Sequence, residues 1–180
     1  VCFETNTPGS GTVTWGETEA YGFSATSTPV TLNVPEYIRY QHKVRVDGLI
    51  MDTAYHYQIS HGGEISGDYE FRTFPNTVGS FAFAIYGDSR GGTVDAPNVE
   101  HEAVILGMQN ESPGLFVNTG DLVSSGEELV DWEYMFHADK DFMATVPLLP
   151  VFGNHEDGWS DETGINGDQN FARLFDTGKD

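Results

Sequence analysis

The chain has 180 residues, 38% of them hydrophobic, which is enough for one large or two small domains with a core. Its 28 acidic residues against 8 lysines and arginines give a formal net charge of −20, which argues against binding nucleic acid through a basic surface. No apolar run approaches the roughly 18 residues of a membrane span, and a single cysteine, Cys2, excludes a disulfide within the chain.

The acidic excess lies mainly in the second half of the chain, where residues 76–180 carry 19 acidic and 4 basic side chains. Such a field repels anionic substrates unless bound divalent cations reverse it locally. Two further interpretations stay open. One is a high-salt habitat, because about 1 M salt shortens the screening length to about 3 Å. The other is an ordinary acidic secreted protein.

Residues 1–74 alternate apolar and polar side chains over short runs, a pattern typical of antiparallel strands. Turn residues such as Pro8-Gly9-Ser10-Gly11 and Gly62-Gly63 separate the runs, and no helical pattern interrupts them. We therefore expect a β-sandwich. The expected strands are residues 1–5, 11–16, 40–49, 54–60 and 68–74.

The pattern changes after residues 75–79, which indicate a linker. Apolar runs of strand length then alternate with stretches of helical spacing, which predicts a parallel sheet with its functional loops at the carboxyl ends of the strands. The run at 81–87 is nearly continuous in apolar residues, as expected for a strand covered on both faces. The expected elements are strands at 81–87, 115–119 and 148–153 and helices at 98–110 and 127–143.

Each of these three strands ends in a short loop with a metal-type ligand, and the ligands are evenly spaced along the chain. Asp88 and Asp121 offer carboxylate oxygens, which suit Mg, Mn, Fe or Zn ions and can bridge two cations. Asn154 offers a neutral carbonyl oxygen, and the imidazole of His155 suits proton transfer. Together these groups suit the hydrolysis of a phosphoester.

The three loops resemble the signature blocks of the calcineurin-like metallophosphoesterase superfamily, over about residues 81–175. The matching segments are Gly87-Asp88, Gly120-Asp121-x-x-x-x-Gly126 and Gly153-Asn154-His155-Glu156. The resemblance implies two divalent or trivalent metal ions (Fe, Zn or Mn) and a metal-activated water. It also implies that Asp88 binds the first ion, Asp121 bridges, Asn154 binds the second, and His155 contacts the phosphoryl group or assists the leaving group.

The segment HKVRVDGLIMDTAYHYQIS at 42–60 and the segment FRTFP at 71–75 resemble the fibronectin type III-like domain in front of purple acid phosphatases. The resemblance implies an incomplete all-β domain at residues 1–75, followed by an α/β metallophosphoesterase domain at 80–180 that is truncated at its C-terminus. The superfamily completes its site with later histidines, and no histidine follows His155. We therefore expect a fragment of a longer enzyme that is inactive alone.

Two positions depart from the patterns of these relatives. Arg90 stands where many members of the superfamily have a metal-binding histidine, and Ser124 stands where purple acid phosphatases have a tyrosine ligand. The guanidinium of Arg90 either contacts the phosphate or pairs with one of the many nearby acids. Among the other histidines, we assign His42, His56 and His61 to strand or surface packing in the β-domain and His101 and His137 to solvated helix faces.

The leading hypothesis is an acid phosphatase-like phosphomonoesterase acting on a phosphate ester, secreted, periplasmic or on the cell surface. One alternative is a phosphodiesterase or nucleotidase of the same superfamily. The other is a non-catalytic extracellular binding or adhesion protein with a degenerate site. The chain begins Val1-Cys2-Phe3 without an initiator methionine or a signal-like segment, so we expect its natural N-terminus upstream. Nothing in the residues indicates the oligomeric state.

Overall fold

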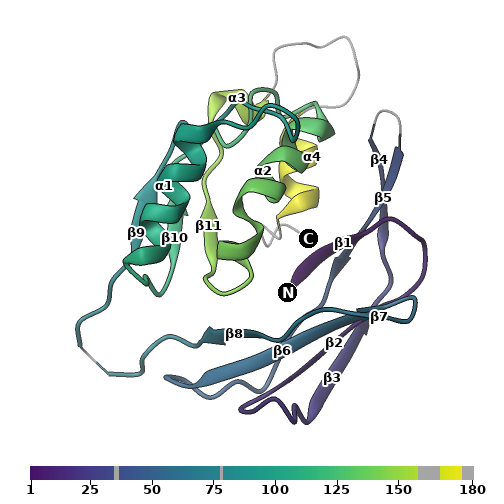
Figure 1. The fold of residues 1–180 in the computed structure, drawn as a ribbon, viewed down its shortest axis with the longest axis vertical. Helices are drawn as coiled ribbons and strands as arrows, with labels where there is room; N and C mark the ends of the chain where they lie inside the picture. The colour runs from purple at the N-terminus through teal and green to yellow at the C-terminus, as the bar shows by residue number, and fades with distance from the viewer. Residues whose placement is uncertain (35–36, 78, 158–166, 176–180) are drawn as a thin grey trace. The chain divides into compact units, whose positions relative to one another are not determined.

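The computed structural model describes residues 1–34, 37–77, 79–157 and 167–175 (Figure 1). The chain divides into two compact units, Val1–Ser80 and Phe81–Asp180, called the first and second unit below. The first unit is all-β, and the second combines a parallel sheet with helices. This is the predicted fold class.

Two antiparallel sheets build the first unit. One has the order β1 (Cys2–Thr5), β5 (Tyr37–Lys43), β4 (Val30–Val34). The other has the order β3 (Phe23–Ser27), β2 (Gly11–Gly16), β6 (Ala54–His61), β7 (Glu64–Ile65), with β8 (Tyr69–Arg72) also paired to β6. Alternate residues of β2 and β6 point into the core, as the period of a half-buried strand requires. The core side chains are Val13, Trp15, Val44, Tyr55 and Tyr57.

Four of the five predicted strands coincide with β1, β2, β6 and β8, but β3, β4 and β7 were missed and the strand predicted at 40–49 was misplaced. The missed β3, FSATS, has exposed or half-buried side chains and is held mainly by its backbone pairing to β2, so apolar alternation does not mark it. The strand at 40–49 instead spans 37–43. Only Val44 continues the pairing, through two hydrogen bonds of 2.8 Å with Val1.

The second unit has the predicted β-α-β-α-β order. Its elements are β9 (Ala84–Tyr86), α1 (Val99–Asn110), β10 (Phe116–Asn118), α2 (Leu129–Met143) and β11 (Leu148–Pro150), followed by α3 (Asn154–Asp157) and α4 (Gly167–Leu174). The three strands are parallel in the order β11-β10-β9. No helix in the described part of the chain is long and apolar enough to cross a membrane.

Only one face of this sheet is covered by α1 and α2. Ile105 of α1 and Phe142 of α2 pack with Tyr86 and Phe116 of the sheet, whereas Ile85 on the opposite face is 59% exposed. The expectation that the run 81–87 is covered on both faces is therefore wrong for the described residues. Because the strands follow one another in a single direction across the sheet, right-handed crossovers place both helices on the same side.

Candidate active site

The three loops predicted to carry the chemistry meet at the carboxyl edge of the parallel sheet. Tyr86, Asn118 and Pro150 are in register at the ends of β9, β10 and β11, so the loops start at the same level. Backbone bonds continue between the first two loops, with Asp88 N–H donating to the carbonyl of Gly120 at 3.1 Å. The parallel order thus brings together segments that are far apart in sequence.

Asp88 and Asp121 both adopt a left-handed backbone conformation, with φ of 53° and 57°. Few residues other than glycine adopt this conformation, and such strain concentrates at functional sites. Gly120 has φ of 110°, and a Cβ there would lie 2.9 Å from the Cα of Gly153. Gly120 therefore lets the second loop turn sharply and also lets the third loop approach it closely.

One nitrogen of Arg90 joins the two aspartates. Arg90 Nη1 lies 3.0 Å from Oδ1 of Asp88 and 2.7 Å from Oδ2 of Asp121. The Asp121 carboxylate is nearly buried, and its other oxygen accepts the backbone N–H of His155 at 3.2 Å. The side chain of Asp88 is 79% exposed. The two carboxylates therefore converge on one point, one of them fixed by the fold and the other open to solvent.

The side chain of His155 is held by the second loop, through the backbone of Ser124. Its Nδ1 lies 2.8 Å from the backbone carbonyl of Ser124, and because a carbonyl only accepts, Nδ1 carries the hydrogen. Ser124 thus acts on the site through its backbone. Asn154 precedes His155 as the exposed first residue of α3.

Glu156 holds the second and third loops together, a role that the sequence did not reveal. Its fully buried carboxylate accepts the backbone N–H groups of Asp121 (2.9 Å), Leu122 (2.7 Å), Val123 (3.2 Å) and Gly153 (2.7 Å). Hydrogen bonds to an ionised acceptor are about twice as strong as neutral ones. The only signal in the sequence was that Glu156 directly follows His155 in the third block.

A buried polar cluster lies behind the first loop. His101 donates from Nδ1 to the carbonyl of Ser89 at 3.0 Å, and its Nε2 lies 2.6 Å from Oδ1 of Asp139. Tyr86 O–H donates to the other oxygen of Asp139 at 2.9 Å. The assignment of His101 to a solvated helix face is wrong, because it is 4% exposed, whereas His137 is exposed as expected.

This environment changes the protonation of His101. Burial lowers the pKa of its imidazole, but the hydrogen bond and charge of Asp139 outweigh burial, so the pKa lies above its ordinary value. Both ring nitrogens face acceptors, which is the arrangement of an imidazolium. The cluster ties Ser89, next to Asp88, to α2 and thereby positions the first loop.

Comparisons with known proteins match one family to each unit of the chain. The family model for the N-terminal domain of purple acid phosphatases matches residues 1–73, and that for calcineurin-like phosphoesterases matches residues 81–179. No curated protein matches the chain.

Two solved structures have the same fold. A purple acid phosphatase from yellow lupin (Lupinus luteus) seeds is 19% identical, with a TM-score of 0.66, and the match covers 92% of this chain and 35% of that one. The structure of PhoD is 14% identical, with a TM-score of 0.59, and the match covers 86% of this chain and 34% of that one. The chain thus spans about a third of the length of either structure. With both units matched in order and the signature loops assembled at one sheet edge, the chain belongs to the calcineurin-like phosphoesterase family.

Proposed function

We propose that the second unit carries the first part of the site of a metal-dependent phosphoester hydrolase. Asp88, Asp121 and Asn154 would bind metal ions, and Arg90 and His155 would contact the phosphoryl group. The observation that carries this proposal is the convergence of two carboxylates on one nitrogen, at 3.0 and 2.7 Å, at the carboxyl edge of a parallel sheet. Both carboxylates belong to residues in a left-handed conformation.

The donor atoms fit hard or borderline cations such as Mn, Fe or Zn, because two carboxylates and one amide oxygen are available. The two oxygens of Asp121 make different contacts, one with Arg90 and one with the N–H of His155, which supports a bridging role. Two bound ions would polarise the phosphoryl oxygens and activate the attacking water. We infer two ions from the family resemblance.

The remaining steps fall to side chains of this chain. His155 would donate the proton of Nε2 to the leaving oxygen, since the bond from Nδ1 to Ser124 fixes the orientation of the ring. The guanidinium of Arg90 is 35% exposed and would hold phosphoryl oxygens with nitrogens other than the one shared by the aspartates.

The finer assignments are also proposals. We infer a phosphomonoester as the substrate and a secreted, periplasmic or cell-surface location from the likeness of the first unit to the N-terminal domain of purple acid phosphatases. We propose domains at residues 1–75 and 80–180, and the division of the compact units between Ser80 and Phe81 supports this boundary. The first domain would be fibronectin type III-like.

Hydrolysis of p-nitrophenyl phosphate by the full-length gene product, with added Mn²⁺, Zn²⁺ or Fe³⁺, tests the function. We expect Asp121→Asn to lower kcat at least about 100-fold, because metal and phosphoryl contacts depend on this carboxylate. Asp141→Asn removes the same charge from the exposed surface of α2 and should leave kcat unchanged. Equal activity of both variants would contradict the proposal, and faster hydrolysis of bis-p-nitrophenyl phosphate would favour a phosphodiesterase.

A non-catalytic protein is the second candidate, and one observation favours it. Arg90 already supplies a positive charge to both aspartates, which satisfies them without a metal ion. Under this alternative no added cation stimulates hydrolysis, and isothermal titration of the full-length protein with Mn²⁺ detects no binding that depends on Asp121.

A further inference from the structure

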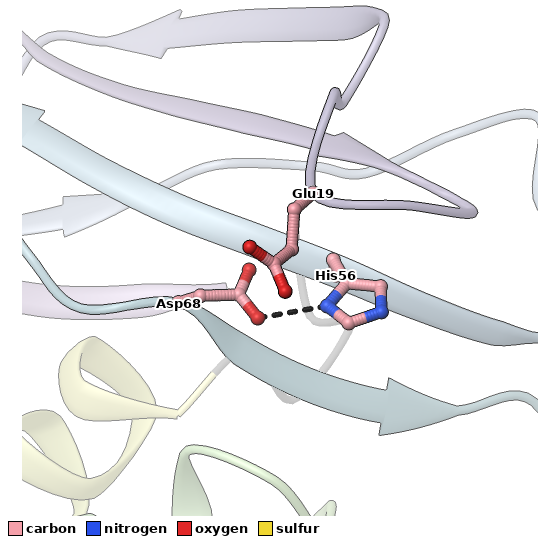
Figure 2. A group of neighbouring side chains, drawn as sticks. All are labelled: Glu19, His56 and Asp68. Atoms are coloured by element: carbon pink, nitrogen blue, oxygen red, sulfur yellow. Dashed lines mark hydrogen bonds and ion pairs between the residues drawn. The ribbon is translucent and has the colours of Figure 1, made fainter.

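Three metal-type ligands meet on the first unit, far in sequence from the loops of the second. They are Glu19 in the turn between β2 and β3, His56 on β6, and Asp68 just before β8 (Figure 2). One ligand atom from each lies within 4.8 Å of the others. Figure 2 shows both carboxylates pointing toward the Nδ1 side of the imidazole.

Pairing of neighbouring strands builds this cluster. His56 is paired with Gly16 of β2 on one side and with Glu70 of β8 on the other. Any Cβ at Gly16 would collide with the backbone of Tyr21, so the absence of a side chain lets the β2–β3 turn fold back over this position. The hydroxyl of Tyr21 then donates to Oδ1 of Asp68 at 3.1 Å. Three segments are thus fixed around one imidazole.

Negative charge exceeds what the imidazole can balance. Nδ1 of His56 lies 2.7 Å from Oδ2 of Asp68, and Nε2 lies 3.6 Å from Oε2 of Glu70. Among the described residues, the carboxylate of Glu19 has no hydrogen bond or salt bridge, although it lies beside that of Asp68. Even a protonated imidazole leaves two uncompensated negative charges among these four groups, and a divalent cation would balance them.

The ligand types select the cation. A nitrogen of imidazole together with two carboxylate oxygens suits Zn²⁺ or a similar transition ion better than Mg²⁺ or Ca²⁺, which take oxygen ligands. Bonds of about 2.0–2.2 Å to Zn²⁺ place tetrahedral ligand atoms about 3.3 Å apart. His56 Nδ1 and Asp68 Oδ2 lie 2.7 Å apart, and all three ligand atoms lie within 4.8 Å of one another, so the group is close to this spacing.

We propose that Glu19, His56 and Asp68 form a surface binding site for Zn²⁺ or a similar divalent transition ion. The ion takes the place of the hydrogen between Nδ1 and Asp68, which is released to solvent, and three protein ligands leave a position for water. Bound metal connects the β2–β3 turn, β6 and the segment before β8. It therefore stabilises the first unit in proportion to its occupancy.

Isothermal titration of the full chain with Zn²⁺ tests this site, because it counts binding events. The Asp121→Asn background removes a ligand of the site proposed for the second unit, so Zn²⁺ binding there should weaken. In that background we expect one remaining Zn²⁺ event, weakened at least about tenfold by Glu19→Gln and by His56→Ala, since each removes a ligand. Thermal unfolding of the first unit should shift upward with Zn²⁺, and the shift should disappear in both variants.

Matched controls separate a ligand role from the general attraction of an acidic surface. Glu17→Gln removes the same charge from the same exposed turn, and His61→Ala removes a histidine from the same strand. Both should bind Zn²⁺ like the unaltered chain. If Glu19→Gln and the Glu17→Gln control bind Zn²⁺ with the same affinity, whether high or low, the proposal is overturned. Failure of the phosphatase assay would leave it standing, because neither the site nor the readout involves hydrolysis.

Discussion

Arg90 is the basic residue at the centre of the candidate site. Its guanidinium joins the two aspartates that we propose as ligands. A cation that binds between Asp88 and Asp121 must therefore compete with a positive charge held by the protein. Arg90 therefore holds the two carboxylates together and also weakens their attraction for a metal ion.

Arg90→Gln should therefore tighten Mn²⁺ binding and weaken inhibition by inorganic phosphate. The variant removes a positive charge that repels Mn²⁺. Because solvent partly screens this repulsion, we expect a gain of about 1 kcal/mol in binding free energy, or a factor of about five in affinity. It also removes the guanidinium that would hold phosphate. Isothermal titration and inhibition constants measure the two effects. Arg173→Gln, which removes an exposed charge on α4, controls for net charge, and unchanged Mn²⁺ affinity in Arg90→Gln would refute the competition.

At the scale of elements, the sequence predicted the site residues that follow a local pattern. It missed the roles of side chains that depend on burial against distant segments. Gly-Asp and Gly-Asn-His after apolar runs placed Asp88, Asp121 and His155 at strand ends, because parallel strands share one carboxyl edge. The burial of Glu156 and His101 was not predictable, since their partners are backbone groups and an aspartate from other segments. The polar edge strand β3 was missed because strand pairing, not apolar alternation, holds it.

His101 joins α1, α2 and the first loop, and its protonation makes this junction sensitive to pH. Because the pKa in the folded state lies above the ordinary value of 6.5, the stabilisation is complete below about pH 6.5 and is lost as the pH rises through the folded pKa. The groups facing the ring are Asp139 of α2, Tyr86 of β9 and the Ser89 carbonyl, with Glu102 nearby on α1.

Unfolding in urea across about pH 5.5–9 measures this effect. His101→Gln should cost about 3 kcal/mol at the acidic end, because it leaves a buried carboxylate without its charged partner. The cost should shrink as the pH rises and the unaltered imidazole loses its proton. His137→Gln, an exposed histidine on α2, should give a curve parallel to that of the unaltered chain. A cost of His101→Gln that is independent of pH would show that the imidazole does not titrate in this range.

For the whole molecule, the dominant physical quantity is the net charge of −20. It is unevenly spread, because residues 1–75 hold 9 acidic and 4 basic side chains and residues 76–180 hold 19 and 4. Repulsion among acidic side chains should therefore destabilise the second unit more than the first. The three interpretations of this charge, local metal binding, a high-salt habitat and an ordinary acidic surface, differ in which cations relieve the repulsion.

Thermal unfolding at increasing NaCl concentrations distinguishes these three interpretations of the charge. Raising the salt from about 0.1 M to 1 M shortens the screening length from about 10 Å to about 3 Å, so we expect the transition of the second unit to rise by several degrees and that of the first by less. Near the sequence pI of about 4.3 the net charge vanishes, and the salt effect should vanish with it.

The outcomes separate the three interpretations. If millimolar Mn²⁺ at low salt raises the unfolding temperature of the second unit as NaCl does, and has no such effect in Asp121→Asn, the acidic excess serves metal binding. If the unfolding temperature rises only in molar NaCl, with or without a divalent ion, the high-salt habitat is favoured. Screening then acts on the whole surface and not at one site. Equal small shifts in both units would leave the ordinary acidic surface as the explanation, since the uneven charge would then have no effect on stability.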